Sequence, residues 1–144
     1  MGYQKPLPSP DPESAPFWEG CREGRLLIQR CRTCGTHRFP PTDFCPACRS
    51  HETEWVEASG RGRVFSWIVV RHPVPKEVYA GEVPYVVAIV ALEEGVRMVS
   101  NLVEVAPEAV TADMAVEVRF RPAAEGIVLP VFAPAAVGAS GGSA

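Results

Sequence analysis

The stretch CRTCGTHRFPPTDFCPAC, residues 31–48, decides the fold of the first part of this chain. It places four cysteines in two C-x-x-C pairs, with ten residues between the pairs. Such cysteines form disulfides, act as a redox pair or hold a metal ion. No strand–helix–strand pattern surrounds either pair, which argues against a thioredoxin-type redox motif. In a reducing compartment, paired cysteines favour metal ligation over disulfides.

The cysteine spacing is typical of a zinc ribbon, because a C-x-x-C turn brings two thiolates to one side of a tight knuckle. Gly35 follows the first pair, where a knuckle often needs a left-handed residue, and Pro46 stiffens the second pair. Four thiolates leave no open position on zinc, so we predict a structural site; rubredoxin-like iron is the alternative. The predicted ligands are Cys31, Cys34, Cys45 and Cys48.

The other cysteine and the histidines have ordinary interpretations. Cys21 is expected to be a small buried apolar side chain, with a nucleophilic role as the alternative. His37 and His51 are expected at the surface, because four cysteines already complete the ligand set. His72 lies in RHPVPK, residues 71–76, beside two basic residues. That cluster suits phosphates or an acidic patch on a partner, or it is a solvated loop.

Composition divides the chain into five segments. The Pro-, Ser- and acid-rich start predicts an extended arm, and the Gly- and Ser-rich end predicts a flexible tail. A short amphipathic helix is expected next, capped by Ser14 and ended by Gly24. Its aromatic residues Phe17 and Trp18 need a surface to pack on, in this chain or in a partner. The predicted boundaries are arm 1–16, helical segment 17–27, zinc ribbon 28–51, OB-fold barrel 52–134 and tail 135–144.

The chain after the cysteines is rich in β-branched and aromatic residues, and short turn signals separate its apolar runs. One connection, residues 72–84, is long, and long loops are often functional. Five or six strands with short turns predict a mostly β fold with a closed OB-like barrel, since a seven-stranded sandwich needs more strands. The expected strands span 52–58, 63–71, 85–92, 96–105, 115–120 and 127–134, with a helical turn at 106–114.

Composition and charge argue against several classes of protein. No apolar run approaches the roughly 20 residues of a membrane-spanning helix. The first 16 residues lack an apolar signal-peptide core, so we expect a cytoplasmic protein. The formal net charge of −3 argues against a general nucleic-acid binder. Residues 18–63 nevertheless carry eight arginines against six acids, which either attracts an anionic ligand or is solvated surface charge.

Several separated motifs resemble one known family. They are FWEGCREGRLLIQRC, the four-cysteine ribbon with its FPP, WVEASGRGRVFSW, PYVVAIVALEEGVRMVSNLV and a final LPVF. Over residues 16–134 the chain resembles the zinc-ribbon plus OB-fold accessory proteins of acyl-CoA metabolism. The resemblance implies an N-terminal helical segment, a rubredoxin-like zinc ribbon and a C-terminal OB barrel that admits the CoA part of an acyl-CoA.

The resemblance also implies a function. Members are accessory subunits that pair with thiolase-superfamily enzymes, including thiolases and steroid side-chain aldolases of the lipid-transfer type. We therefore expect a non-catalytic, acyl-CoA-binding subunit of a hetero-tetramer that cleaves a C–C bond by a retro-aldol or thiolytic reaction. The chain itself shows no G-x-S-x-G, P-loop or G-x-G-x-x-G motif, so the chemistry is assigned to the partner.

Two alternatives stay open. Other family members pair with enoyl-CoA hydratases of the hot-dog fold. A single-stranded nucleic-acid binder is the second alternative, because the alternation of the strand predicts Phe65 and Trp67 on one face, near Arg63 and Arg71. The competing interpretation is that both aromatic side chains fill the barrel core.

Five residues are predicted to contact CoA. Tyr85 starts a strand directly after the long loop. Asn101 is polar within the apolar run MVSNLV, so its amide needs partners, which an internal hydrogen bond or a β-bulge would also supply. The predicted contacts are Trp67, Arg71, His72, Tyr85 and Asn101.

Overall fold

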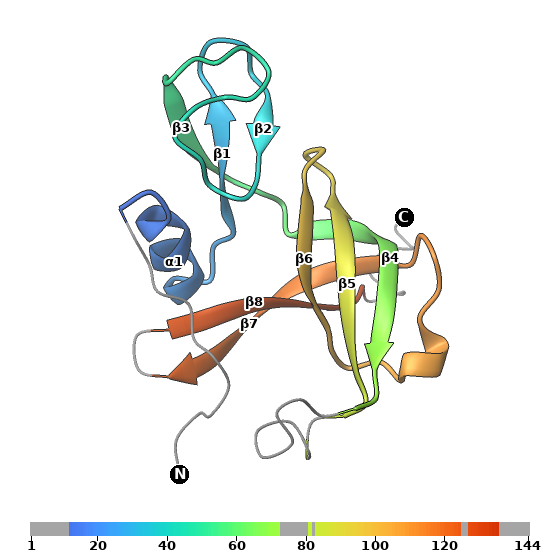
Figure 1. Ribbon diagram of the computed structural model, residues 1–144. Coiled ribbons are helices and arrows are strands. Elements are labelled where there is room, and N and C mark those ends of the chain that lie inside the picture. The colour runs from blue at the N-terminus through green and yellow to red at the C-terminus, as the bar shows by residue number, and fades with distance from the viewer. Residues whose placement is uncertain (1–11, 73–80, 82, 125–126, 136–144) are drawn as a thin grey trace.

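The computed structural model describes residues 12–72, 81, 83–124 and 127–135. Most of the expected arm, most of the connection 72–84 and all but the first residue of the expected tail lie outside the described residues. Within them, the chain folds as predicted into a short helix, a ribbon and a five-stranded barrel (Figure 1). The elements are α1 (Ala15–Arg22), β1 (Leu27–Cys31), β2 (His37–Arg38), β3 (Thr53–Glu57), β4 (Arg61–Val70), β5 (Tyr85–Leu92), β6 (Arg97–Leu102), the 3-10 helix η1 (Pro107–Ala109), β7 (Ala115–Ala124) and β8 (Ile127–Pro134).

Helix α1 begins and ends earlier than the segment 17–27 that the sequence suggested. Ser14 takes the N-cap position, and its carbonyl accepts bonds from the backbone N–H of Phe17 and Trp18. Gly24 has a φ of +75° just past the helix, as a glycine at this position should. Among the described residues, no helix has the length and apolar character needed to cross a bilayer.

The aromatic face of α1 packs inside this chain. Phe17 is only 3% exposed, and its ring centroid lies 4.8 Å from that of Trp18 and 5.3 Å from that of Phe39. Of the two surfaces that the sequence allows for Phe17, the one within this chain is therefore the one it packs on. Phe39 lies next to β2, and α1 also contacts β1 and the barrel strand β8, so ribbon and barrel together supply this surface.

The ribbon sheet has the strand order β2-β1-β3. Strand β1 pairs antiparallel with β3 along its whole length, from Leu27 opposite Glu57 to Cys31 opposite Thr53. The sequence predicts that residues 53–57 belong to the barrel segment 52–134. In the structure, β3 instead joins the ribbon sheet, because its backbone ladder runs along β1 and not along a barrel strand.

The barrel closes in the order β4-β5-β6-β8-β7, with β7 returning to pair with β4. Strands β6 and β8 pair in parallel where Leu102 faces Phe132, and the other neighbours are antiparallel. A five-stranded barrel with this crossed order is the OB architecture. The closing ladders are short, since β4 pairs with β7 only over Arg61–Arg63 and β6 pairs with β8 only at Leu102.

A β-bulge in β4 changes which way its aromatic side chains point. Phe65 follows buried Val64, points outward and is 51% exposed. Because the register to β5 shifts between Val64 and Ser66, the next outward residue is Ser66, and Trp67 packs against the core. The prediction that these two aromatic residues share one face is wrong, and so is the interpretation that both fill the core. One extra residue in a strand reverses the alternation beyond it.

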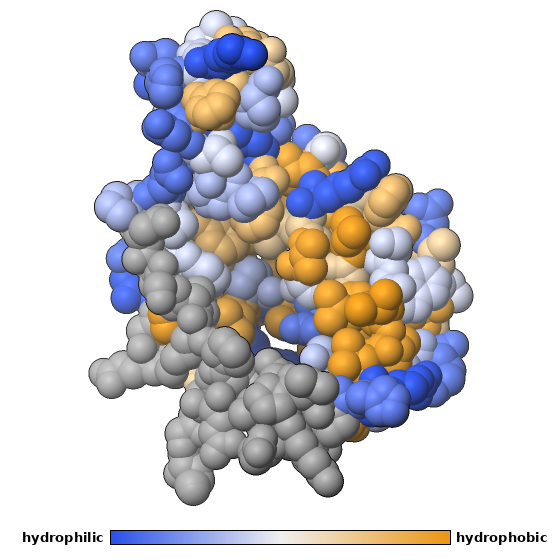
Figure 2. All heavy atoms as spheres, in the orientation of Figure 1, coloured by the Kyte–Doolittle hydropathy of each residue, from blue (hydrophilic) through white to orange (hydrophobic). Residues whose placement is uncertain are grey.

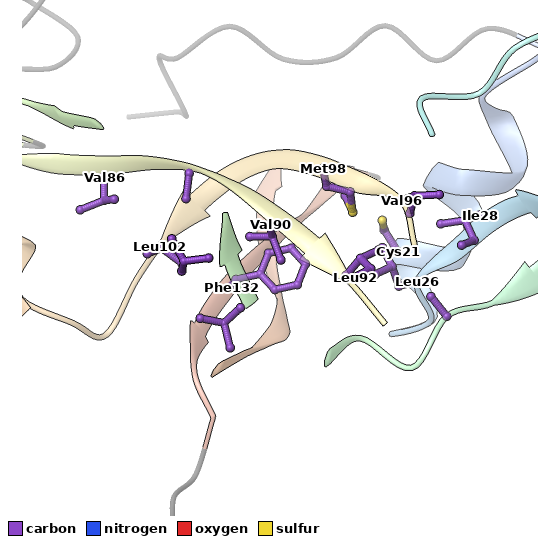
Figure 3. Close-up of a cluster of buried hydrophobic side chains, with 14 of the residues drawn as sticks. Cys21, Leu26, Ile28, Val86, Val90, Leu92, Val96, Met98, Leu102 and Phe132 are labelled. Atoms are coloured by element: carbon purple, nitrogen blue, oxygen red, sulfur yellow. The ribbon is translucent and has the colours of Figure 1, made fainter. Parts of the chain in front are cut away.

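One hydrophobic cluster spans the helix, the base of the ribbon and the barrel. Figure 3 shows Cys21 and Leu26 beside Leu92 and Val96 of the barrel hairpin. The backbone N–H of Ala58 also donates to the carbonyl of Leu26 across 2.7 Å. The ribbon and the barrel therefore share one hydrophobic core and are not joined by a linker alone.

Candidate metal centre and ligand site

The four predicted ligand thiols come together at the tip of the ribbon. Their Sγ atoms all lie within 4.8 Å of one another, with 3.5 Å between Cys31 and Cys48 and 3.7 Å between Cys34 and Cys45. A tetrahedron with metal–sulfur bonds of about 2.3 Å has edges of about 3.8 Å, so the thiols fit a zinc ion. All of the cysteines are free, and these separations are far longer than a disulfide bond.

The two knuckles have the same backbone geometry. The N–H of Gly35 donates to the carbonyl of Cys31 across 2.9 Å, and the N–H of Arg49 donates to that of Cys45 across 2.7 Å. Both residues have positive φ, +82° at the glycine and 68° at the arginine. The left-handed position predicted after the first pair is present, and it recurs after the second pair with an arginine in it.

Backbone and hydroxyl donors favour the thiolate form at the first knuckle. The N–H of Cys34, 3.4 Å from the Sγ of Cys31, and the N–H of Thr33 lower the pKa of Cys31 to about 6. The Thr36 hydroxyl, 3.2 Å from the Sγ of Cys34, lowers the pKa of that thiol as well. Since a metal binds thiolates and not thiols, this environment prepares both side chains for ligation.

The histidines stay outside the metal cluster, as predicted. Among the described residues, the cysteines form the cluster without a histidine or carboxylate. The Nδ1 of His51 lies instead 3.0 Å from the carbonyl oxygen of Asp43, and His37 lies on β2. A site closed by four thiolates has no open coordination position, so its role is to hold the ribbon.

A buried polar network supports the loop before the second knuckle, and no local sequence signal predicts it. Gln29 and the backbone of Thr42 exchange two hydrogen bonds, of 3.1 and 2.8 Å. Arg38 is only 5% exposed; its Nε donates to Thr42 Oγ1 and its Nη2 to Thr53 Oγ1, both across 2.8 Å. The guanidinium therefore ties the loop before Cys45 to strand β3.

The five predicted CoA contacts do not gather into one cluster. Trp67 faces the barrel interior, whereas Tyr85 lies opposite Val70 on the outward side of the wall. Arg71 and His72 are exposed just beyond the end of β4. Three of the five, Arg71, His72 and Tyr85, thus lie at one end of the barrel.

Asn101 has an internal partner. Its Nδ2 donates to the carbonyl of Val86 across 3.0 Å, which satisfies the amide as the sequence analysis allowed. Arg71 has a loose ion pair, with 3.8 Å between its Nη2 and Glu108 Oε2, and both side chains are exposed. Such an exposed pair contributes little, so the guanidinium stays available to another anion.

Fold and metal cluster together define a class of two-module protein, a four-cysteine ribbon joined to an OB barrel. Family models agree: residues 18–54 match the ChsH2 rubredoxin-like zinc ribbon domain, and residues 55–121 match the ChsH2 C-terminal OB-fold domain. The chain belongs to this family of ChsH2-type zinc-ribbon plus OB-fold proteins.

A solved structure and two relatives illustrate the family. The structure titled "Ltp2-ChsH2(DUF35) aldolase" is 43% identical, with a TM-score of 0.81, covering 90% of this chain and 99% of that one. A "DUF35 domain-containing scaffold protein" of Methanocaldococcus jannaschii is 42% identical over 72% of this chain and 74% of its own length. A "Probable enoyl-CoA hydratase alpha subunit" of Thermomonospora curvata is 44% identical over 91% of this chain, which spans only 40% of that relative.

Proposed function

We propose that this chain is a non-catalytic accessory subunit of a thiolase-superfamily enzyme that cleaves a C–C bond of an acyl-CoA by a retro-aldol reaction. The observation that carries the proposal is its likeness, over 99% of the solved chain, to the protein titled as an aldolase with ChsH2. A thiolytic partner fits the same role. The scaffold name of the Methanocaldococcus relative supports an assembly role over a chemical one.

The chemical step belongs to the partner in this proposal. Among the described residues, the cluster of nucleophilic groups is the four-cysteine site, whose thiols fit a structural metal. Cys21 is 1% exposed, and burial raises its pKa to about 12, so it is a poor nucleophile. We assign zinc to the ribbon, where its binding energy goes into folding this module.

The acyl-CoA ligand is assigned to the barrel end that carries Arg71, His72 and Tyr85. Its support is chemical: an exposed guanidinium can meet a phosphate through two parallel hydrogen bonds. OB barrels are general ligand scaffolds, and Trp67 lines the interior of this one. Asn101 is a weaker candidate, because its amide already has a bond to the backbone.

A hydratase role is the second candidate, favoured by one specific observation. The Thermomonospora relative is named a hydratase alpha subunit, and the aligned region covers 91% of this chain. The match covers only 40% of the relative's length, so its name describes a larger protein. The aldolase assignment is preferred because the solved chain corresponds to this one almost end to end.

The test is a native pull-down of the tagged chain from the cells that make it, with metal analysis and mass spectrometry. A thiolase-superfamily enzyme and about one zinc per chain support the proposal. The purified pair should then cleave an acyl-CoA C–C bond, and native mass spectrometry should give a hetero-tetramer. A hot-dog-fold hydratase in its place supports the second candidate. Recovery of the chain with nucleic acid and no enzyme overturns both.

A further inference from the structure

The outward side of strands β4, β5 and β6 is apolar where a barrel surface is normally polar. We define the barrel outer face by the residues that alternate outward along these strands. Ile68 is 63% exposed and Val99 is 68% exposed, and these are large values for aliphatic side chains. Its apolar residues are Phe65, Ile68, Val87, Ile89 and Val99, and the polar residues Arg63, Ser66, Arg97 and Asn101 lie on the same side.

Cross-strand pairing makes this face continuous. Ile68 lies opposite Val87 in one row, which Asn101 completes on β6, and Ile89 lies opposite Val99 in the next row, which Ser66 completes on β4. The apolar side chains of the two rows are neighbours across β5, with one polar residue at the end of each row. Figure 2 shows apolar side chains gathered over this part of the barrel. An antiparallel sheet usually alternates apolar inward and polar outward, so the pattern needs a separate cause. Contiguous exposed apolar surface commonly marks a site of protein contact.

The charge on this face has one sign. Arg63 and Arg97 lie in one cross-strand row on either side of Ala91. The guanidinium of Arg97 lies over the ring of Phe65, with its carbon 3.9 Å from the ring centroid. Among the described residues, neither arginine makes an ion pair with a carboxylate; Arg63 Nη1 donates only to the carbonyl of Asp113. Both cations are therefore available to an acidic partner.

A second copy of this chain is a poor occupant. In a two-fold symmetric dimer the same face meets itself, and the outward residues of β4, β5 and β6 that form this face supply no carboxylate to meet Arg63 and Arg97. Complementary charges across an interface select the partner. The better occupant has an apolar surface edged with carboxylates.

We propose that the barrel outer face is the surface on which the enzyme subunit docks, with carboxylates of the enzyme meeting Arg63 and Arg97. The inference rests on the proposed function, and it names the surface that performs it. Docking would bury the exposed aliphatic side chains, and Phe65 with its stacked guanidinium would serve as a central anchor, since aromatic and arginine side chains dominate such interfaces.

The experiment uses the thiolase-superfamily enzyme recovered with the wild-type chain, purified and titrated with single variants. Ile68→Glu and Val99→Glu are expected to raise the Kd at least tenfold, because each places a charge in the buried centre. Arg97→Glu should also raise the Kd at least tenfold, whereas Arg97→Lys, which keeps the charge, should raise it much less. The matched control is Phe44→Glu, at an apolar side chain that is 43% exposed on the ribbon, and its Kd should stay within about twofold of wild type.

Each outcome decides. If wild type binds and Val99→Glu binds equally well, the docking surface is overturned while the proposed function stands. If Phe44→Glu loses as much affinity for the enzyme as Val99→Glu does, the docking surface is overturned as well. If sedimentation shows a wild-type dimer that Val99→Glu dissociates, the face is a self-interface and the inference is wrong. If the wild-type chain binds no thiolase-superfamily enzyme, the proposed function falls and takes the inference with it.

Discussion

Gly35 and Arg49 occupy the same place in the two cysteine knuckles, each with a left-handed backbone and each donating to the carbonyl of the first cysteine of its pair. Glycine adopts this conformation without steric cost, whereas a side chain costs about 1–2 kcal/mol there. A Cβ on Gly35 would also lie 3.2 Å from Arg30 Nη2.

The two positions should therefore respond in opposite directions. Gly35→Ala is expected to lower the free energy of unfolding of the metal-loaded protein by about 1–2 kcal/mol. Arg49→Gly is expected to raise it by about 0.5–1 kcal/mol, after the greater unfolded-state entropy of glycine is subtracted. Urea unfolding with excess metal measures both. Changes of the same sign would contradict the equivalence of the knuckles.

Removing a ligand should remove the metal without touching chemistry. Cys31→Ser and Cys45→Ser are expected to lower the metal content from about one per chain to near zero, because a serine hydroxyl is a poor zinc ligand. Partner binding should weaken with the loss of the ribbon. Cys21→Ser is the control, since this residue lies outside the cluster, and it should keep its metal. A ligand variant that assembles fully yet loses one chemical step would contradict the structural role.

Metal affinity should depend more steeply on pH below about pH 6, because metal binding then releases one further proton, from the thiol of Cys31. The lowered pKa of Cys31, about 6, means that this thiol is already ionised in the metal-free folded protein above that pH. Its thiolate stabilises the fold at higher pH, and that contribution is lost as the pH falls through 6. Below pH 6 metal binding must also displace its proton. Competition with a chelator between pH 5 and 8 should show log affinity steepening by about one unit per pH unit. A constant slope would count against this.

Cys21 should be unreactive in the native protein. Its pKa of about 12 leaves roughly one molecule in 10⁴ ionised at pH 8. With metal on the other four thiols, iodoacetamide should add nothing to the native chain. After denaturation with a chelator it should modify all five cysteines of the chain. Intact mass measures both states, and native modification at Cys21 would restore the nucleophile interpretation.

The sequence predicted the features that depend on local chemistry. Strands 85–92 and 127–134 have the bounds that their apolar runs suggested, because each run ends at a clear turn or proline signal. The helical turn at Pro107 and the left-handed Gly35 also follow from single residues. The metal cluster was predictable since four cysteines at this spacing have few other uses.

What the sequence did not reveal depends on contacts between distant residues. No glycine marks the bulge at Phe65, so the sequence of this strand predicts an unbroken alternation of inward and outward side chains. The pairing of β3 with β1 follows from the tertiary fold, and Arg38 looks like any surface arginine until Thr42 and Thr53 surround it. The CoA contacts remain predictions: Arg71, His72 and Tyr85 lie at one barrel end, whereas Trp67 packs against the core and the amide of Asn101 bonds to Val86.

The common core of ribbon and barrel has an evolutionary consequence. Leu26 and Ile28 at the base of the ribbon belong to one cluster with Leu92 and Val96 of the barrel, and only residues 58–60 separate β3 from β4. The boundary between the two family models, at 54/55, even falls inside β3. Recombination at that point would join the barrel to a ribbon from another protein, whose side chains would not pack against Leu92 and Val96. The two modules should therefore be inherited as a unit, and a working chimera would have to carry the helix, β3 and the facing barrel hairpin together.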